Sequence, residues 1–179
     1  MIKQRYDFDE VRKIYQENQK QLDNLVQNIV QLSCENGQTI ATAESCTGGL
    51  LSQKITAVPG ASQMFALGIC TYTNEMKTAI LHVPESTLHT YTAVSPQTAI
   101  AMANGVAALS HADFALSVTG YAGPGGGTSE HPVGTVFWVL RIMALHLPCI
   151  CRLTSWAFLL EKVSGKERQS VHLALQGKF

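Results

Sequence analysis

Thr42-Ala-Glu-Ser-Cys-Thr-Gly-Gly49 is the segment from which the predicted architecture follows. A strand candidate, Gln38–Ala43, leads into this segment, and a helical run that opens at Gly48-Gly49 and continues through Ala57 follows it. A strand that turns directly into a helix exposes short side chains at the edge of a sheet, beside the backbone N–H groups of the helix N-terminus. The segment is therefore predicted to lie at one edge of an α/β sheet.

Strand and helix candidates alternate along the rest of the chain. Helices are predicted at Asp7–Gly37, from Asn74 as the N-cap to a point before Pro84, from Ser95-Pro96 to about Ser110, and from about Lys166. Strands are predicted at Phe65–Thr73, Phe114–Val118, Gly134–Leu140 and Cys149–Phe158.

This alternation predicts an α/β fold of three layers, α/β/α, because strands that alternate with helices form a sheet covered on both faces. The last two strands are adjacent in sequence and can form an antiparallel hairpin, so a mixed central β-sheet is expected. The first helix is more polar before Leu22. We therefore expect an N-terminal helical extension over residues 1–21 and one compact domain over residues 22–179.

Composition limits the possible partners. Of 179 residues, 46% are apolar and 15% are charged, which is typical of a globular domain with a hydrophobic core. The formal net charge is zero, and without a basic run neither a nucleic acid nor an anionic membrane is an expected partner. Charged residues and a proline interrupt the apolar stretch Val133–Leu160, so it predicts buried strands and no membrane span.

The cysteines and histidines give no sign of a disulfide framework or a metal site. The five cysteines are odd in number and contain no CxxC pair, which indicates reduced thiols in a cytoplasmic protein. No metal-ligand spacing occurs among the six histidines, so no metal and no cofactor are expected. The cysteines are Cys34, Cys46, Cys70, Cys149 and Cys151, and the histidines are His82, His89, His111, His131, His146 and His172.

Ser45 is the candidate nucleophile of the first segment. Its hydroxyl can attack a carbonyl carbon while N–H groups of the helix N-terminus stabilise the oxyanion, and Gly48 and Gly49 let a substrate approach the backbone. Two other interpretations stay open. Ser45 or Thr47 can simply cap the helix, and the Cys46 thiolate can be the nucleophile instead.

A second candidate group is Tyr72-Thr-Asn-Glu-Met-Lys77. If Asn74 caps the helix, Lys77 lies in its first turn, where the helix dipole disfavours an ammonium group and favours the neutral amine. A neutral lysine or a tyrosinate at Tyr72 can accept the serine proton, as in Ser-Lys hydrolases. A surface lysine beside a half-buried tyrosine is the alternative.

A third candidate is the glycine-rich segment Ser117–Thr128, which follows a predicted strand. Its backbone N–H groups can bind a phosphate or a carboxylate. The segment is neither a P-loop nor a dinucleotide-binding fingerprint, because no Gly-Lys-Ser/Thr follows and no helix begins there. A flexible surface loop is the alternative interpretation.

Taken together, five segments resemble the CinA C-terminal domain family, which includes nicotinamide-nucleotide amidohydrolases. The resemblance runs from about Leu22 to Val139, with the motifs in the same order and spacing as in the family. The matching segments are AESCTGG (Ala43–Gly49), YTNEMK (Tyr72–Lys77), AVS (Ala93–Ser95), SVTGYAGPGGG (Ser117–Gly127) and PVGTV (Pro132–Val136).

The resemblance implies metal-independent hydrolysis of nicotinamide mononucleotide to nicotinate mononucleotide and ammonia. By motif match it makes Ser45 the nucleophile and Tyr72 and Lys77 its activating partners. It also implies the stand-alone form of the domain, since only a short helical extension precedes it. The candidate substrate-binding residues are Thr47, Gly48, Gly49, Asn74, Ser95, Thr119, Gly120, Gly123, Gly125 and Arg168.

The C-terminal part departs from the family pattern. Residues 141–158 are unusually apolar, and His172 stands where a second arginine is expected after Arg168. Arg168 can still bind a phosphate through its planar guanidinium group. The departure leaves an alternative function, a non-catalytic nucleotide-binding or regulatory module. Apolar surface near Phe137–Phe158 also makes a homodimer or a higher homo-oligomer an expected possibility.

Overall fold

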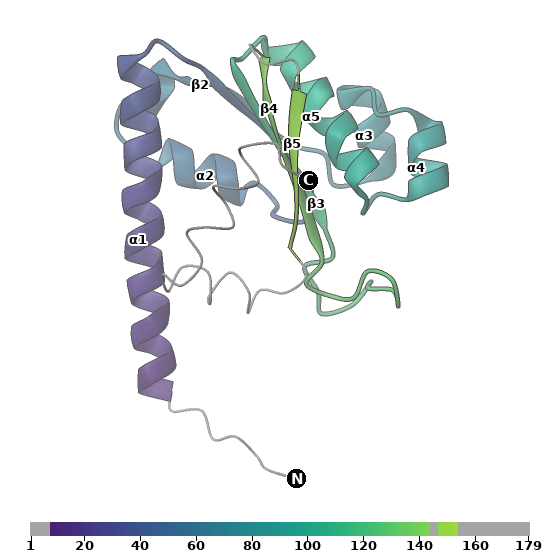
Figure 1. Cartoon of the computed structure of the whole chain (residues 1–179), viewed down its shortest axis with the longest axis horizontal. Coiled ribbons are helices and arrows are strands. Elements are labelled where there is room, and N and C mark those ends of the chain that lie inside the picture. Colours follow the sequence, from purple (N-terminus) through teal and green to yellow (C-terminus); the bar gives the residue numbers. More distant parts are fainter. Residues whose placement is uncertain (1–7, 144–146, 154–179) are drawn as a thin grey trace.

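The computed structural model describes residues 8–143 and 147–153 of the chain, and Figure 1 shows its elements in order. They are α1 (Phe8–Glu35), β1 (Ile40–Glu44), α2 (Leu50–Thr56), the 3-10 helix η1 (Ala61–Gln63), β2 (Phe65–Cys70), α3 (Asn74–Leu81), α4 (Glu85–Tyr91), α5 (Pro96–Ser110), β3 (Phe114–Gly120), β4 (Val136–Ile142) and β5 (Leu147–Leu153). The predicted last helix lies outside the described residues.

A five-stranded mixed sheet forms the centre of the fold, in the order β2-β1-β3-β4-β5. β1 pairs in parallel with both β2 and β3, whereas β4 is antiparallel to β3 and to β5. The predicted α/β class and mixed sheet are confirmed, and so is the predicted hairpin of the last two strands.

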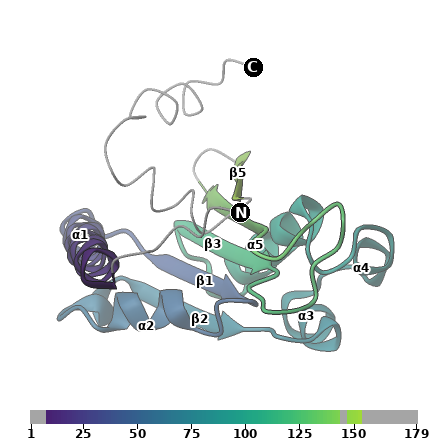
Figure 2. The same cartoon turned by 90° about the horizontal axis from the view of Figure 1, so that it is seen from below.

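Helices lie on both faces of this sheet (Figure 2). Alternate side chains of β1 point to opposite faces: Ala41 and Ala43 belong to the core beneath α5, whereas the Thr42 hydroxyl is 2.9 Å from the Ser52 hydroxyl of α2. The connection from β1 to β2, which contains α2, therefore lies on one face of the sheet. The connection from β2 to β3, which contains α5, lies on the other face. Such a reversal places a crevice outside the carboxyl ends of β1 and β3.

Two helix starts test the predicted caps. Ser95 caps α5 as expected, since its Oγ accepts a hydrogen bond from the Thr98 backbone N–H and Pro96 is the first helical residue. The predicted cap at Asn74 is wrong. Thr73 caps α3 with an extended backbone and accepts a hydrogen bond from the Met76 N–H, so Asn74 is already inside the helix.

The helix predicted at Asp7–Gly37 is confirmed as α1, whereas the domain boundary expected after residue 21 stays a prediction. α1 is continuous through Gln21, and the Lys54 ammonium on α2 contacts the Asp23 carboxylate at 2.7 Å and the side-chain amide oxygen Oε1 of Gln19 at 3.2 Å. α4 was not predicted. It is a seven-residue helix after Pro84, and its short, polar sequence gives little helical periodicity.

Gly105, in the middle of α5, is required by the close approach of α3. A Cβ atom at this position would lie 2.8 Å from the Leu81 carbonyl carbon and 2.9 Å from the Leu81 Cβ. The two helices therefore pack backbone against backbone.

We expect Gly105→Ala to destabilise the protein, although alanine normally favours a helix interior over glycine. Overpacking of a tight contact costs about 1–3 kcal/mol, and urea unfolding would measure the loss. Gly125→Ala is the control, because a Cβ there meets nothing within 4 Å. Equal stability of Gly105→Ala and the parent would contradict the packing argument.

Candidate active site

Ser45 and Lys77 meet at the carboxyl end of β1, an inner strand of the sheet. Ser45 directly follows β1 and is 8% exposed, while Lys77 projects from α3 and is 1% exposed. The Lys77 Nζ lies 3.0 Å from the Ser45 Oγ. The structure thus brings together two of the three predicted catalytic side chains, which are 32 residues apart in sequence.

The surroundings of the Lys77 amine favour its neutral form. Burial lowers the pKa of Lys77, and nearby thiols and the Glu75 carboxylate only partly offset that effect. Besides the serine hydroxyl, Nζ contacts two backbone carbonyl oxygens, those of Thr71 at 2.8 Å and Tyr72 at 3.4 Å. A neutral amine has two N–H donors and one lone pair. If the carbonyls accept both donors, the lone pair is directed to the Ser45 hydroxyl.

Glu44, the residue before Ser45, holds the turn between β1 and α2 in place. Its side chain is fully buried, and its two carboxylate oxygens accept five hydrogen bonds. The donors are the Thr47 and Ser52 hydroxyls and the backbone N–H groups of Gly49, Leu51 and Ser52, at 2.7–3.2 Å. Burial alone would raise the pKa of Glu44, but hydrogen bonds from Ser52, Thr47 and Leu51 together hold it below the ordinary value.

The Glu44 carboxylate occupies N–H groups that we predicted would stabilise an oxyanion. We expected free N–H groups at the start of α2, but those of Gly49, Leu51 and Ser52 bond to Glu44, and that of Gly48 bonds to the Ser45 carbonyl. That expectation is wrong for these groups. Within residues 8–143 and 147–153, the N–H groups of Cys46 and Thr47 donate to no other residue.

Tyr72 contacts the Lys77 amine of the Ser45–Lys77 pair through its backbone. Its carbonyl oxygen accepts from Lys77, whereas its side chain is 73% exposed. The predicted role of the phenol as a proton acceptor for Ser45 stays a prediction.

Cys46 and Cys70 lie near the same site as free thiols. Burial raises the pKa of both thiols, and the Coulombic attraction of Lys77 only partly offsets this. A raised pKa keeps a thiol protonated and poorly nucleophilic. The electrostatics therefore favour Ser45 over Cys46.

Several candidate substrate-binding residues form hydrogen bonds or close contacts within the protein. The Thr47 hydroxyl is bonded to Glu44, Ser95 caps α5, and the Thr119 hydroxyl donates to the Ala93 carbonyl at 2.7 Å. Gly120 leaves space for β4, since a Cβ there would lie 2.6 Å from the Thr135 carbonyl oxygen. Gly48 and Gly49 both have left-handed backbones, which the sharp turn after Ser45 requires.

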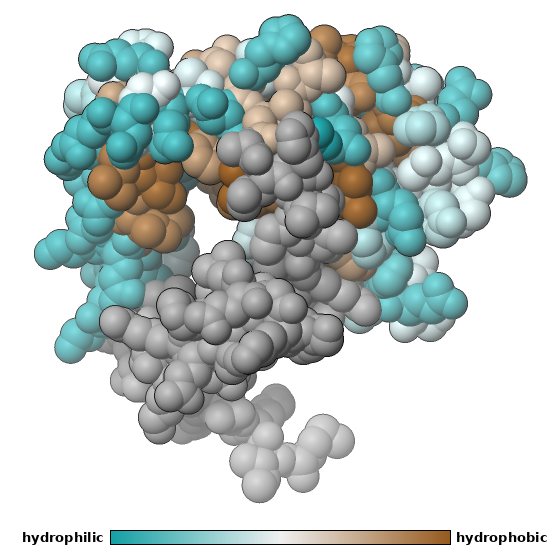
Figure 3. Space-filling model, turned by 45° about the horizontal axis from the view of Figure 1, so that its top comes forward, coloured by the Kyte–Doolittle hydropathy of each residue, from teal (hydrophilic) through white to brown (hydrophobic). Residues whose placement is uncertain are grey.

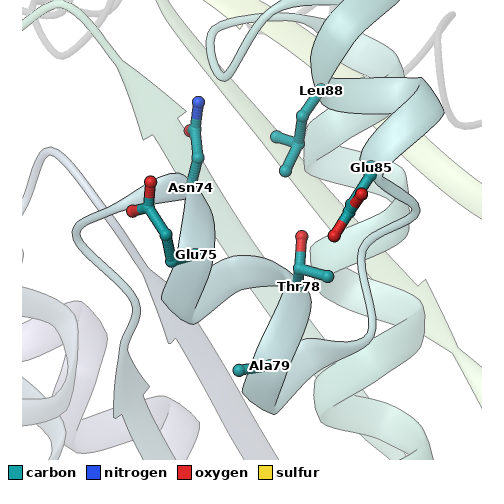
Figure 4. A pocket seen from close by; sticks show the side chains of 6 residues that line it. All are labelled: Asn74, Glu75, Thr78, Ala79, Glu85 and Leu88. Atoms are coloured by element: carbon teal, nitrogen blue, oxygen red, sulfur yellow. The ribbon is translucent and has the colours of Figure 1, made fainter.

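Asn74 lines a cavity of about 390 Å³ between α3 and α4, together with Glu75, Thr78, Ala79, Glu85 and Leu88 (Figure 4). Neither Ser45 nor Lys77 lines this cavity. The predicted role of Asn74 in substrate binding stays a prediction.

A second cavity, of about 350 Å³, lies between the start of α5 and the loop that follows β3. Its lining includes Ser95, Tyr91, Tyr121 and residues 128–131. Tyr121 follows β3 at the sheet edge where Ser45 follows β1. Gly123 and Gly125 belong to the same loop but do not line the cavity, and Arg168 lies outside the described residues.

Glu44 is the functional residue that sequence reasoning missed. A signal in the sequence indicated that another residue must accept hydrogen bonds from the start of α2. Gly48-Gly49 provide no side-chain cap there, and the first turn of α2 contains no acidic residue. Uncapped N–H groups require an acceptor, and Glu44 was the nearest acidic residue.

Metal ligands and membrane spans were searched for in the described residues only. There, no three His, Cys, Asp or Glu residues lie close enough to hold a metal ion. In the same part of the chain, no helix combines the length and apolarity needed to cross a bilayer.

The fold and the site define an α/β protein with a buried Ser-Lys pair at the carboxyl edge of its parallel strands. Residues 22–148 match the model of the CinA C-terminal domain, and the chain belongs to this family. It is 53% identical over 115 residues to a CinA-like protein of Desulfotalea psychrophila, a match that covers 64% of this chain and 28% of that protein. The chain spans less than a third of the length of the curated relatives it matches first.

Solved structures show the same fold. The competence/damage inducible protein CihA of Agrobacterium tumefaciens is similar with a TM-score of 0.74 and 35% identity, and the match covers 87% of this chain and 95% of that one. A competence-damaged protein (CinA) superfamily protein of Escherichia coli has a TM-score of 0.71 and 31% identity, with 78% of this chain and 81% of that one covered.

We expect Glu44→Gln to lower the free energy of unfolding at pH 7 by at least about 1–3 kcal/mol, because an amide cannot accept all the donors that face the carboxylate. The folded-state pKa of Glu44 is lowered, so its stabilisation is present above the unfolded pKa and is lost as the pH falls through the folded value. The difference from the parent should therefore shrink on acidification.

Urea unfolding at several pH values measures this difference. Glu17→Gln, at an exposed position of α1, is the matched control and should behave like the parent. A pH-independent difference for Glu44→Gln would contradict the assigned role of the carboxylate.

Proposed function

We propose that the protein is an amidohydrolase in which Ser45 is the nucleophile and Lys77 is the general base. The observation that carries the proposal is the 3.0 Å contact between the Lys77 Nζ and the Ser45 Oγ, at a buried amine whose pKa is lowered by burial. A neutral amine within hydrogen-bond distance of a hydroxyl has the geometry that a general base requires.

The reaction proceeds in two halves. Lys77 takes the proton of Ser45 as the hydroxyl oxygen attacks the carboxamide carbon. When the tetrahedral intermediate collapses, the C–N bond breaks and the Lys77 ammonium returns the proton to the departing nitrogen, which leaves as ammonia. Water, deprotonated by the same amine, then attacks the acyl-enzyme, and the carboxylic acid is released as Ser45 is reprotonated.

The N–H groups of Cys46 and Thr47 are the proposed donors to the oxyanion. They lie in the turn directly after the nucleophile and have no other acceptor among the described residues. The N–H of the residue after a nucleophile at a strand-to-helix turn has this role in other acyl-transfer enzymes.

The proposed substrate is nicotinamide mononucleotide, which the family resemblance suggests. The 350 Å³ cavity beside Ser95 and Tyr121 is the proposed site for the rest of the nucleotide. Its hydroxyl groups and two tyrosine rings can contact a sugar and a planar base.

We expect Ser45→Ala to lower kcat for nicotinamide mononucleotide by about 10³-fold or more, because the nucleophile is lost. Lys77→Met should lower kcat by about 10²–10⁴-fold, the usual contribution of general-base catalysis. Ammonia release is the readout, and circular dichroism verifies folding.

Cys46→Ala is the control for the rival nucleophile and should keep most of the activity. Loss of activity in Cys46→Ala but not in Ser45→Ala would overturn the assignment. If the parent binds the nucleotide tightly without turnover, the protein is a non-catalytic module instead.

The pH profile tests the base separately. Only the neutral amine accepts a proton, so kcat/KM should rise with pH through the pKa of Lys77 in the free enzyme. That pKa is lowered by burial, so the midpoint of the rise should lie below the ordinary value of 10.5 for lysine. A profile that rises only at or above this value would contradict the role of burial.

A further inference from the structure

The Thr71 hydroxyl is a buried polar group without a hydrogen-bond partner. Figure 3 shows many hydrophilic residues on one face of the molecule, where water satisfies their donors and acceptors. Thr71 is instead 0% exposed, and its Oγ1 has no hydrogen-bond partner among the described residues. Burying a hydroxyl without a partner costs free energy. Such a group beside a candidate active site is therefore a candidate for contact with a ligand.

Thr71 lies beside the nucleophile on the same face of the sheet. It directly follows β2, and its backbone N–H donates to the Glu44 carbonyl oxygen at 2.9 Å, which continues the parallel pairing of β2 with β1. Ala43 and Ile69 are partners in this pairing, and both contribute to the core beneath α5. Side chains alternate between the two faces of a sheet, so the next pair on that face is Ser45 and Thr71.

The Lys77 amine connects these two residues. Its Nζ lies 3.0 Å from the Ser45 Oγ and 2.8 Å from the Thr71 carbonyl oxygen. All three residues are nearly enclosed by the protein. In the proposed mechanism the departing nitrogen takes its proton from Lys77, so this nitrogen must lie within hydrogen-bond distance of Nζ. The Thr71 side chain is therefore close to the place where the C–N bond breaks.

We propose that Thr71 determines the specificity of the site for primary carboxamides, because its hydroxyl oxygen accepts a hydrogen bond from the NH2 group of the substrate. This inference rests on the proposed amidohydrolase function. The two backbone carbonyls near Nζ already accept hydrogen bonds from Lys77, whereas the Thr71 hydroxyl is an acceptor that the Ser45–Lys77 pair leaves unused. A carboxamide nitrogen has two N–H donors, and this hydroxyl can accept from one of them.

An ester with the same acyl group differs from the amide at this one position. Its alkoxy oxygen has no hydrogen to donate and is a poor acceptor, so the Thr71 hydroxyl would stay unpaired in the complex with an ester. A site that hydrogen-bonds an N–H group of its substrate discriminates against an analogue without that group. Thr71 should therefore favour the amide over the ester.

Hydrolysis of a matched amide and ester tests the inference. Nicotinamide mononucleotide and the methyl ester of nicotinate mononucleotide both give nicotinate mononucleotide, which chromatography quantifies. Thr71→Val replaces the hydroxyl by a methyl group of similar size. We expect it to lower the amide-to-ester ratio of kcat/KM by about 10-fold, the loss of one hydrogen bond. Thr71→Ser retains the hydroxyl and should retain the ratio of the parent.

Thr135→Val is the matched control, because the Thr135 hydroxyl, just before β4, is also fully buried without a hydrogen-bond partner in the described part of the chain. This variant should leave the ratio unchanged. An unchanged ratio in Thr71→Val, or an equal loss with both substrates, would overturn the inference and leave the amidohydrolase assignment intact. A parent that does not hydrolyse the amide would overturn that assignment, and the inference with it.

Urea unfolding tests the unpaired hydroxyl independently of turnover. We expect Thr71→Val to be at least as stable as the parent, because an apolar group of the same shape replaces a buried hydroxyl that has no partner. A clear fall in the urea midpoint would mean that the hydroxyl is bonded within the folded protein, which also contradicts the proposed role.

Discussion

The conformation of the turn after β1 depends on the hydrogen bonds of the buried Glu44 carboxylate. The carboxylate takes the place of the missing cap of α2, and its five hydrogen bonds connect the end of β1 with the first turn of that helix. A buried charge is stable only when its lone pairs are satisfied, so the carboxylate permits one conformation of the residues between. Ser45 is the first of these residues, and its position at the sheet edge follows from that constraint.

The contact between Lys77 and Ser45 depends on the topology of the sheet. Ser45 follows β1 and Lys77 follows β2, and the parallel pairing of the two strands brings both to the same edge. The helices that continue from them lie on opposite faces, so the amine approaches the hydroxyl from the far side of the sheet. Burial there lowers the pKa of Lys77 and so favours the neutral amine that the proposed general base requires.

Much of this arrangement could be predicted from the sequence, because alternating strands and helices admit few topologies and the segment after β1 has strong turn residues. The Ser95 cap and the mixed sheet followed from local patterns. The acceptor for the α2 N-terminus was missed although the uncapped Gly48-Gly49 start was a signal in the sequence, because a carboxylate at a strand end has many possible donors. The sequence predicted a neutral Lys77 because of the helix dipole, whereas in the structure burial lowers its pKa. Burial depends on elements far apart in the chain, so it could not be predicted from the local sequence. The Thr73 cap was missed because Asn74 is an equally good capping residue by type.

The close approach of α3 and α5 at Gly105 also affects the contact between Lys77 and Ser45. Leu81, whose backbone touches Gly105, stands one helical turn after Lys77. The size of residue 105 therefore sets how far α3 stands from the sheet, and with it the separation of amine and hydroxyl. A variant that tolerates a larger side chain there by shifting α3 would keep its fold but separate the amine from the hydroxyl, so a position without any polar side-chain atom can affect the proposed proton transfer.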